Sequence, residues 1–169
     1  MTHAKKIKFV VTDVDGVLTN GQLMFTSEGE HFKSFNTLDG QGIKMLQSCG
    51  IEVAIITGRT SDMVLKRASD LGITTVIQGR EDKWVALEPM LGERGLIPEE
   101  VAYVGDDWPD LACIRRVGLG VAVANADAAV KDHADYITER RGGEGAFREV
   151  ADLILKAQDK YDALLERWL

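Results

Sequence analysis

The chain has 169 residues, of which 45 % are hydrophobic, and a formal net charge of −7. This size and hydrophobicity predict one domain, residues 1–169, and exclude a disordered chain. The negative charge argues against nucleic-acid binding, which needs a basic face. The apolar runs are too short to span a bilayer, so we expect no membrane partner.

We expect no export signal in the first residues. Met1–Lys6 contains lysines, as the start of a signal peptide does, but Asp13 and Asp15 interrupt the apolar run that should follow. The two cysteines, Cys49 and Cys113, have neither metal-binding nor redox spacing and are interpreted as reduced thiols. We therefore expect a cytoplasmic protein.

Short β-like runs and longer amphipathic runs alternate through the first half of the chain. The pattern predicts strands at Ile7–Val14, Gln22–Thr26, His31–Phe35 and Val53–Ile56, and helices at Asp39–Cys49 and from the cap Ser61 to Leu71. The turn residues Ser27–Glu30 between the second and third runs predict a β-hairpin.

The alternation continues to the end of the chain. We predict strands at Thr75–Ile77, Val101–Val104, Leu119–Val123 and Tyr136–Ile137, and helices at Glu81–Arg94, from Asp107 or Trp108 to Arg116, at Asp127–His133, and from the loop Thr138–Gly143 to the C-terminus. Such alternation predicts an α/β fold, with a Rossmann-like parallel sheet that has helices on both faces. Ligands of such folds bind at the carboxyl ends of the strands.

Acidic side chains follow two of the predicted strands. Asp13 and Asp15 end the first strand, and two carboxylates this close repel each other unless a cation joins them. Gly105–Asp110 follows the strand Val101–Val104 and adds carboxylates that suit a hard cation with oxygen ligands. The two segments together predict a metal site.

Groups that suit an anion follow two further strands. Thr57 and Arg59, in Thr57-Gly58-Arg59, offer a hydroxyl and a guanidinium after the strand Val53–Ile56. Lys83 lies at a predicted helix start, where a lysine opposes the helix dipole. Each of these features alone is common. Together with the two acidic segments they make four features in a fixed order, each after a strand or at a helix start, and this combination indicates an active site.

These four segments resemble the motifs of the haloacid dehalogenase superfamily. Asp13–Thr19 is similar to the first motif, Thr57 to the second, Lys83 to the third and Gly105–Asp110 to the fourth. The resemblance implies a Mg²⁺-dependent phosphomonoesterase. The implied catalytic residues are Asp13, Asp15, Thr57 and Lys83. The implied metal ligands are Asp13, Asp106 and the backbone carbonyl of Asp15. Asp107 and Asp110 are implied to support these ligands without binding the metal directly.

In this chemistry, the resemblance implies that Asp13 attacks phosphorus and becomes an aspartyl phosphate, which divides hydrolysis into two easier steps. Asp15 protonates the leaving oxygen and then activates water. Thr57 and Lys83 hold the phosphoryl oxygens. The metal reduces the repulsion between the attacking carboxylate and the anionic phosphate.

The chain as a whole resembles the capless 3-deoxy-D-manno-octulosonate 8-phosphate (KDO 8-phosphate) phosphatases of lipopolysaccharide precursor synthesis. About forty residues separate Asp15 from Thr57, and the hairpin and one helix use them, so no cap domain fits. The resemblance implies a phosphorylated sugar acid as substrate and a homotetramer in which a neighbouring subunit completes each site. The candidate substrate contacts are Asn36, Asp39, Arg59 and Arg141; Leu38 stands where many members have a basic residue.

Three alternatives remain open from the sequence. A related nine-carbon sugar-acid phosphate is the nearest alternative substrate. A phosphoryl-receiver signalling domain has similar groups, but its acidic pair comes first and its acceptor aspartate ends a middle strand, where this chain has Thr57. A non-catalytic assembly module would not be expected to keep Asp13, Asp15, Lys83 and Asp106.

Overall fold

The protein is an α/β domain built on one six-stranded sheet, with strand order β5-β4-β1-β6-β7-β8. The computed structural model describes residues 3–169. Every pairing in the sheet is parallel. The strands are β1 (Phe9–Thr12), β4 (Glu52–Ile56), β5 (Thr75–Ile77), β6 (Val101–Gly105), β7 (Leu119–Ala122) and β8 (Tyr136–Ile137).

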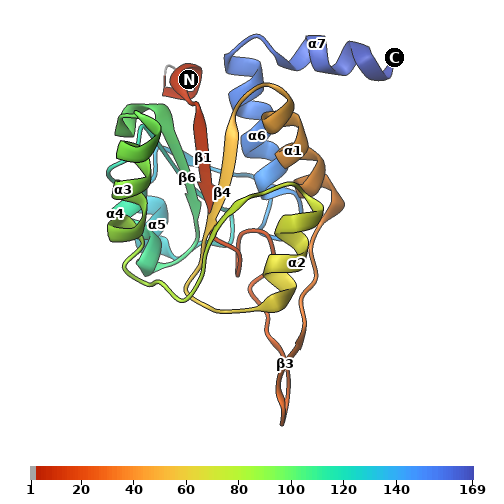
Figure 1. Ribbon diagram of the computed structural model, residues 1–169, viewed down its shortest axis with the longest axis vertical. Coiled ribbons are helices and arrows are strands. Elements are labelled where there is room, and N and C mark those ends of the chain that lie inside the picture. Colours follow the sequence, from red (N-terminus) through yellow and green to blue (C-terminus); the bar gives the residue numbers. More distant parts are fainter. Residues whose placement is uncertain (1–2) are drawn as a thin grey trace.

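Helices cover both faces of the sheet (Figure 1). One face is covered by α1 (Thr37–Ser48) and α6 (Ala146–Ala157), and the other by α3 (Lys83–Arg94), α4 (Leu111–Ile114) and α5 (Ala128–His133). A strand between two helical layers is buried on both faces, which accounts for the mostly apolar, fully buried residues of β1 and β6. The expected fold class is confirmed.

The central strand β1 lies at the point where the strand order reverses. After β1 the chain adds β4 and β5 on one side, and then returns to add β6, β7 and β8 on the other. At such a reversal the connections leave the carboxyl edge in opposite directions and open a crevice there. The segments that follow β1, β4 and β6 therefore meet at one place.

The β-hairpin forms a separate two-stranded antiparallel sheet of β2 (Met24–Thr26) and β3 (Gly29–Phe32). It projects from the body of the protein beside α2 (Asp62–Asp70) (Figure 1). Thr26 pairs with Gly29, so the turn consists of two residues, and the expected four-residue turn Ser27–Glu30 was too long. Among residues 3–169 there is no second domain over the carboxyl edge.

Most expected elements are present, with shifted ends. Helix α1 begins at Thr37, two residues early, because the Asn36 side chain accepts a hydrogen bond from Leu38 N and caps it. Of the four short 3₁₀ segments in residues 3–169, three lie at His3–Lys6, Pro98–Glu100 and Trp108–Asp110. No helix in residues 3–169 has the length and apolar character needed to cross a membrane.

The expected long C-terminal helix was wrong. Helix α6 ends at Ala157, and a short helix α7 (Tyr161–Leu165) and a 3₁₀ turn (Glu166–Trp168) follow it. Asp159 has a φ of 56°, in the left-handed region that interrupts a right-handed helix. Aspartate tolerates this region better than most residues, so the break has a local cause.

Candidate active site

Asp13 lies directly after β1, at the carboxyl edge of the sheet. The backbone continues the sheet there, because Asp13 N donates to Val104 O at 3.0 Å. The Oδ1 atom of Asp13 accepts a hydrogen bond from Val14 N at 2.7 Å, and its Oδ2 atom lies 2.7 Å from Lys83 Nζ. The carboxylate therefore has a fixed orientation.

Lys83 begins α3 and is held by two carboxylates. Its ammonium lies 2.7 Å from both Asp13 Oδ2 and Asp110 Oδ1, and its side chain is 2 % exposed. Burial alone would lower the pKa of Lys83, but the charges and hydrogen bonds of Asp110 and Asp13 raise it. The lysine is therefore a permanent cation beside Asp13, at the helix start where the sequence had suggested an anion-binding role.

Asp110 is completely buried, and all its oxygens are already used. Its Oδ1 accepts hydrogen bonds from Lys83 Nζ and Tyr103 Oη, both at 2.7 Å. Its Oδ2 accepts from Asp106 N at 2.9 Å and from Asp107 N at 3.2 Å. Although one Asp110 oxygen lies within 4.8 Å of one oxygen of Asp13 and one of Asp106, both Asp110 oxygens already accept hydrogen bonds from protein donors. This arrangement suits a supporting group better than a metal ligand.

Asp106, in contrast to Asp110, has a carboxylate oxygen without a hydrogen-bond partner among the described residues. Its Oδ1 atom is buried and has no hydrogen-bond partner within residues 3–169. Burial and the negative charges of Asp110 and Asp13 raise the pKa of Asp106 to about 8. Burial and Asp110 also raise the pKa of Asp13 to about 6, against the effect of Lys83. A divalent cation between these two carboxylates would remove both penalties, so the residues fit Mg²⁺.

The glycine of the first motif makes this approach of carboxylates possible. Gly16 has a φ of +91°, and a Cβ atom there would lie 2.0 Å from Asp106 Oδ2. Any side chain at this position would push Asp106 away from the Asp13 loop. The sequence Asp13-Val14-Asp15-Gly16 thus includes a steric requirement as well as two acids.

A pocket of about 290 Å³ opens over these groups. Its lining includes seven residues expected from the sequence: Asp13, Asp15, Thr57, Arg59, Lys83, Asp106 and Asp107. They come from the segments after β1, β4 and β6 and from the start of α3. A larger groove of about 820 Å³ lies elsewhere, between α1 and the C-terminal helices. It contains none of these acids, so its size does not identify it as the reaction site.

Two of the candidate substrate contacts do not line this pocket. Asn36 Nδ2 donates to Gly143 O at 3.1 Å, and Asp39 Oδ1 accepts from Arg148 N at 3.0 Å. Asp39 is buried, and burial raises its pKa to about 6 despite the backbone donors at the start of α6. Both side chains connect α1 to the segment before and at the start of α6.

Arg141 is exposed and also lies outside the pocket lining. The glycines after it are closely packed, because a Cβ on Gly142 would lie 1.8 Å from Gly16 O. Gly143 N donates to Val17 O at 3.0 Å. The small size of these glycines lets the segment fit tightly against the loop that follows Asp15.

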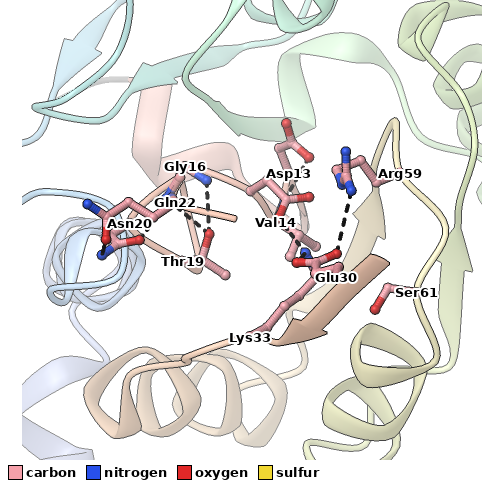
Figure 2. Close-up of polar contacts among 12 residues, drawn as sticks. Asp13, Val14, Gly16, Thr19, Asn20, Gln22, Glu30, Lys33, Arg59 and Ser61 are labelled. Carbon is pink, nitrogen blue, oxygen red and sulfur yellow. Dashed lines mark hydrogen bonds and ion pairs between the residues drawn. The ribbon is translucent and has the colours of Figure 1, made fainter. Parts of the chain in front are cut away.

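The structure also adds residues that the sequence did not single out. Lys33 Nζ lies 2.6 Å from Asp15 Oδ1 and 2.6 Å from Glu30 Oε1, and Glu30 Oε2 lies 3.6 Å from Arg59 (Figure 2). A lone lysine after a strand gives no local signal of such a position. Tyr103, which donates to Asp110, does give such a signal, because it is the only polar side chain in the apolar strand β6.

The similarity of this chain to known proteins agrees with this geometry. Residues 75–149 match the family model of haloacid dehalogenase-like hydrolases. The chain is 46 % identical to the KDO 8-phosphate phosphatase KdsC of Salmonella typhi, over 96 % of this chain and 86 % of that protein.

Two solved structures are very similar to this fold. A KDO 8-phosphate phosphatase from Moraxella catarrhalis, in complex with magnesium, phosphate and KDO, has a TM-score of 0.97 and 45 % identity over 99 % of this chain and 97 % of that one. A probable YrbI family phosphatase from Pseudomonas syringae has a TM-score of 0.97 and 54 % identity over 99 % and 95 % of the two chains.

This similarity over nearly the whole chain excludes a signalling receiver domain, and the intact acidic pocket argues against a non-catalytic module. The chain belongs to the KDO 8-phosphate phosphatase family of haloacid dehalogenase-like hydrolases and is a phosphatase.

Proposed function

We propose that this enzyme hydrolyses KDO 8-phosphate to KDO and inorganic phosphate. The observation that carries the proposal is that Asp13, Asp15, Thr57, Lys83 and Asp106 line one pocket at the carboxyl edge of the sheet. The relatives described above, which are named for this activity and one of which holds KDO and phosphate, support the choice of substrate.

In the proposed first step, Asp13 attacks the phosphorus atom and the bond to the leaving oxygen breaks. Val14 N holds one oxygen of the Asp13 carboxylate, which leaves the other to form the new bond. Lys83 lies beside that oxygen and can bind a phosphoryl oxygen without losing Asp110, its second partner. Thr57, directly after β4, lines the same pocket and supplies a hydroxyl. These donors stabilise the negative charge of the transition state.

Asp15 is the proposed acid and base. Its carboxyl group protonates the leaving oxygen in the first step, and the resulting carboxylate removes a proton from the water that attacks the aspartyl phosphate. Asp13, Asp106 and the carbonyl of Asp15 would hold Mg²⁺, with Asp107 and Asp110 behind them. Bound there, the metal reduces the repulsion between Asp13 and the phosphate.

The metal requirement can be tested directly. We expect exhaustive chelation to abolish turnover and added Mg²⁺ to restore it, and Asp106→Ala to need far more Mg²⁺ or to be inactive. Calcium should bind but support little turnover, since its larger and looser coordination misplaces Asp13. Full activity after chelation would contradict this part of the proposal.

A sugar acid has a carboxylate as well as a phosphate, and the pocket has little positive charge to spare. Lys83 is occupied by two acids, and Arg59 lies 3.6 Å from Glu30. We propose that Arg59 and Arg141 contact the sugar acid. Arg141 is exposed and directly precedes the glycines that pack on the Asp15 loop. Asn36 and Asp39 would contribute by holding this segment.

We further propose that the hairpin assembles the enzyme as a homotetramer whose neighbouring subunits help to complete each site. The hairpin exposes Phe25, which is 63 % exposed, together with Leu23, Met24 and Phe32. A two-stranded hairpin alone is marginally stable in water, so a partner is expected for it. A cyclic or dihedral arrangement would bury the same patch on every copy. The cytoplasmic location stays a prediction.

A hydrolysis screen decides between the candidate substrates. We expect kcat/KM for KDO 8-phosphate to exceed that for a nine-carbon sugar-acid phosphate by about 10-fold or more, the discrimination that one extra carbon unit allows. Ordinary hexose phosphates, which lack the carboxylate, should be poorer still. A preference for the nine-carbon acid would replace the proposed substrate while leaving the proposed chemistry intact.

A further inference from the structure

Lys33 is a buried lysine at the base of the hairpin. It follows β3 directly, and its side chain is 2 % exposed. Its ammonium donates to Asp15 Oδ1 and to Glu30 Oε1, both at 2.6 Å. A buried ammonium is stable only with such partners, and two short charged hydrogen bonds leave it little freedom.

The side chains of Asp15, Lys33, Glu30 and Arg59 form a row of alternating negative and positive charges. Asp15 is followed by Lys33, Lys33 by Glu30, and Glu30 by Arg59 at 3.6 Å. Figure 2 shows Glu30 and Lys33 below Asp13 in the view, with a dashed line that joins Arg59 to Glu30. The segments involved are the loop after β1, the hairpin and the loop after β4, so the row of charges joins three separate parts of the active-site rim.

We propose that Lys33 is a positioning residue that fixes the orientation of the Asp15 carboxyl group for proton transfer. This inference rests on the proposed role of Asp15. Within residues 3–169, Asp15 lines the pocket and Lys33 does not. Lys33 therefore acts through Asp15, without touching the substrate. Glu30 keeps Lys33 shared between two acids, and it connects the hairpin to the acid and base of the reaction.

The chemistry of the first step gives this role a distinct signature. As the Asp13 oxygen bonds to phosphorus, the bond to the leaving oxygen breaks and that oxygen takes its electron pair and the proton of Asp15. A sugar alcohol leaves poorly without the proton, whereas 4-nitrophenolate leaves readily without it. Misplacing Asp15 should therefore slow the first reaction far more than the second.

The test compares kcat/KM for KDO 8-phosphate and for 4-nitrophenyl phosphate, because kcat/KM reports the steps up to the release of the leaving group. We expect Lys33→Met to lose about 10- to 100-fold on KDO 8-phosphate, as loss of a supporting partner commonly does, and only a few-fold on the aryl ester. Lys33→Arg should recover most of the loss. Equal losses on both substrates would overturn the proposal, since a general structural defect affects both alike.

Two further variants keep the test decisive. Lys66→Met removes an exposed lysine that pairs with Asp70 on α2, and it should leave both reactions unchanged. Glu30→Gln leaves Lys33 in place but removes one of its acids. It should show the same substrate-dependent loss in smaller degree, and it replaces Lys33→Met if that variant does not fold. Equal losses in Glu30→Gln would then overturn the inference.

Asp15→Asn separates this inference from the proposed function. If Asp15→Asn is inactive on KDO 8-phosphate while Lys33→Met behaves as the wild type on both substrates, only the role of Lys33 fails. If Asp15→Asn keeps wild-type activity, the proposed acid and base is wrong and the inference falls with it. The mass of every variant in solution shows whether the hairpin variants still assemble as the wild type does.

Discussion

The carboxyl edge of the sheet and the hairpin are close in space but differ in how far their side chains are buried and paired. At the sheet edge, Asp110 is completely buried and accepts hydrogen bonds from four groups. On the hairpin, Phe25 is 63 % exposed, and within residues 3–169 the two strands pair only with each other. In the first region Asp110 receives all its hydrogen bonds from the same chain, whereas the second region leaves its apolar side chains in water.

This difference indicates which properties belong to the single chain. Changes at the sheet edge should affect chemistry or folding in any state of assembly, because their contacts are internal. Changes at the hairpin tip should affect assembly and leave the body of the protein folded. Lys33 is the exception, since it lies at the hairpin base and contacts Asp15.

The largest effect is expected at the sheet edge, for Asp13→Asn. The amide keeps the size of the side chain but is a very poor nucleophile, so turnover should fall by at least about 1,000-fold while the fold is retained. Steady-state kinetics measure the loss, and circular dichroism and thermal unfolding check the fold. Substantial activity in a folded Asp13→Asn protein would refute the aspartyl-phosphate mechanism.

The next largest effect is a loss of stability that should be much greater for Asp110→Ala than for Asp107→Ala. Asp110→Ala would leave the buried Lys83 with Asp13 alone and two backbone N–H groups without an acceptor, so the free energy of unfolding should fall by about 3–5 kcal/mol. Asp107→Ala is the matched control: its side chain is exposed and caps only a 3₁₀ turn, so it should cost about 1 kcal/mol. Urea unfolding of both variants gives the comparison, and equal losses would show that Asp110 is not a special support.

The hairpin tip should respond in assembly rather than stability. We expect the double variant Phe25→Asp, Phe32→Asp to change the mass in solution from tetramer to smaller species, because charges would have to be buried in the proposed interface. Val85→Asp, an equally exposed apolar position on α3, should leave the mass unchanged. A tetramer that survives the double variant would place the interface elsewhere.

The smallest effect concerns pH and Asp39. Burial raises the pKa of Asp39 from 3.8 to about 6 in the folded protein, so the folded state binds the proton more tightly than the unfolded state. Its contribution to stability is therefore present at low pH and is lost as the pH rises through about 6. Asp39→Asn should remove this loss and gain on the order of 1–2 kcal/mol relative to the wild type between about pH 4 and pH 7. Urea midpoints at both pH values measure it; a constant difference would contradict the assignment.

The fold and the centre of the site were predictable because their signals are local. The apolar runs identified β1, β4 and β6, and the acids, threonine and lysine follow directly after them or at a helix start. In a parallel sheet the carboxyl ends of adjacent strands meet, so position in the chain was enough to predict which residues converge. The match of Asp13, Thr57, Lys83 and Asp106 to one pocket follows from this rule.

The remaining features depend on contacts that no local pattern encodes. The pairing of Lys33 with Asp15 depends on how the hairpin returns to the body, and a lysine in that position is usually solvated. The candidate substrate contact Asp39 accepts a hydrogen bond from Arg148 N at the start of α6, 109 positions away in the sequence. Gly142 reads as a flexible residue, yet its backbone packs on Gly16. In each case a segment distant in sequence decides the role.

The tight packing of the loop after β1 has a consequence for the order of folding. Asn125 donates to Gly16 O at 3.0 Å and accepts from Gly142 N, and Gly143 N donates to Val17 O. Residues 16 and 125 are 109 positions apart. During synthesis, the first motif leaves the ribosome before the segment through Gly143, so its loop lacks these contacts until that segment has followed. A nascent chain thus carries its reactive acids long before it can hold them in place.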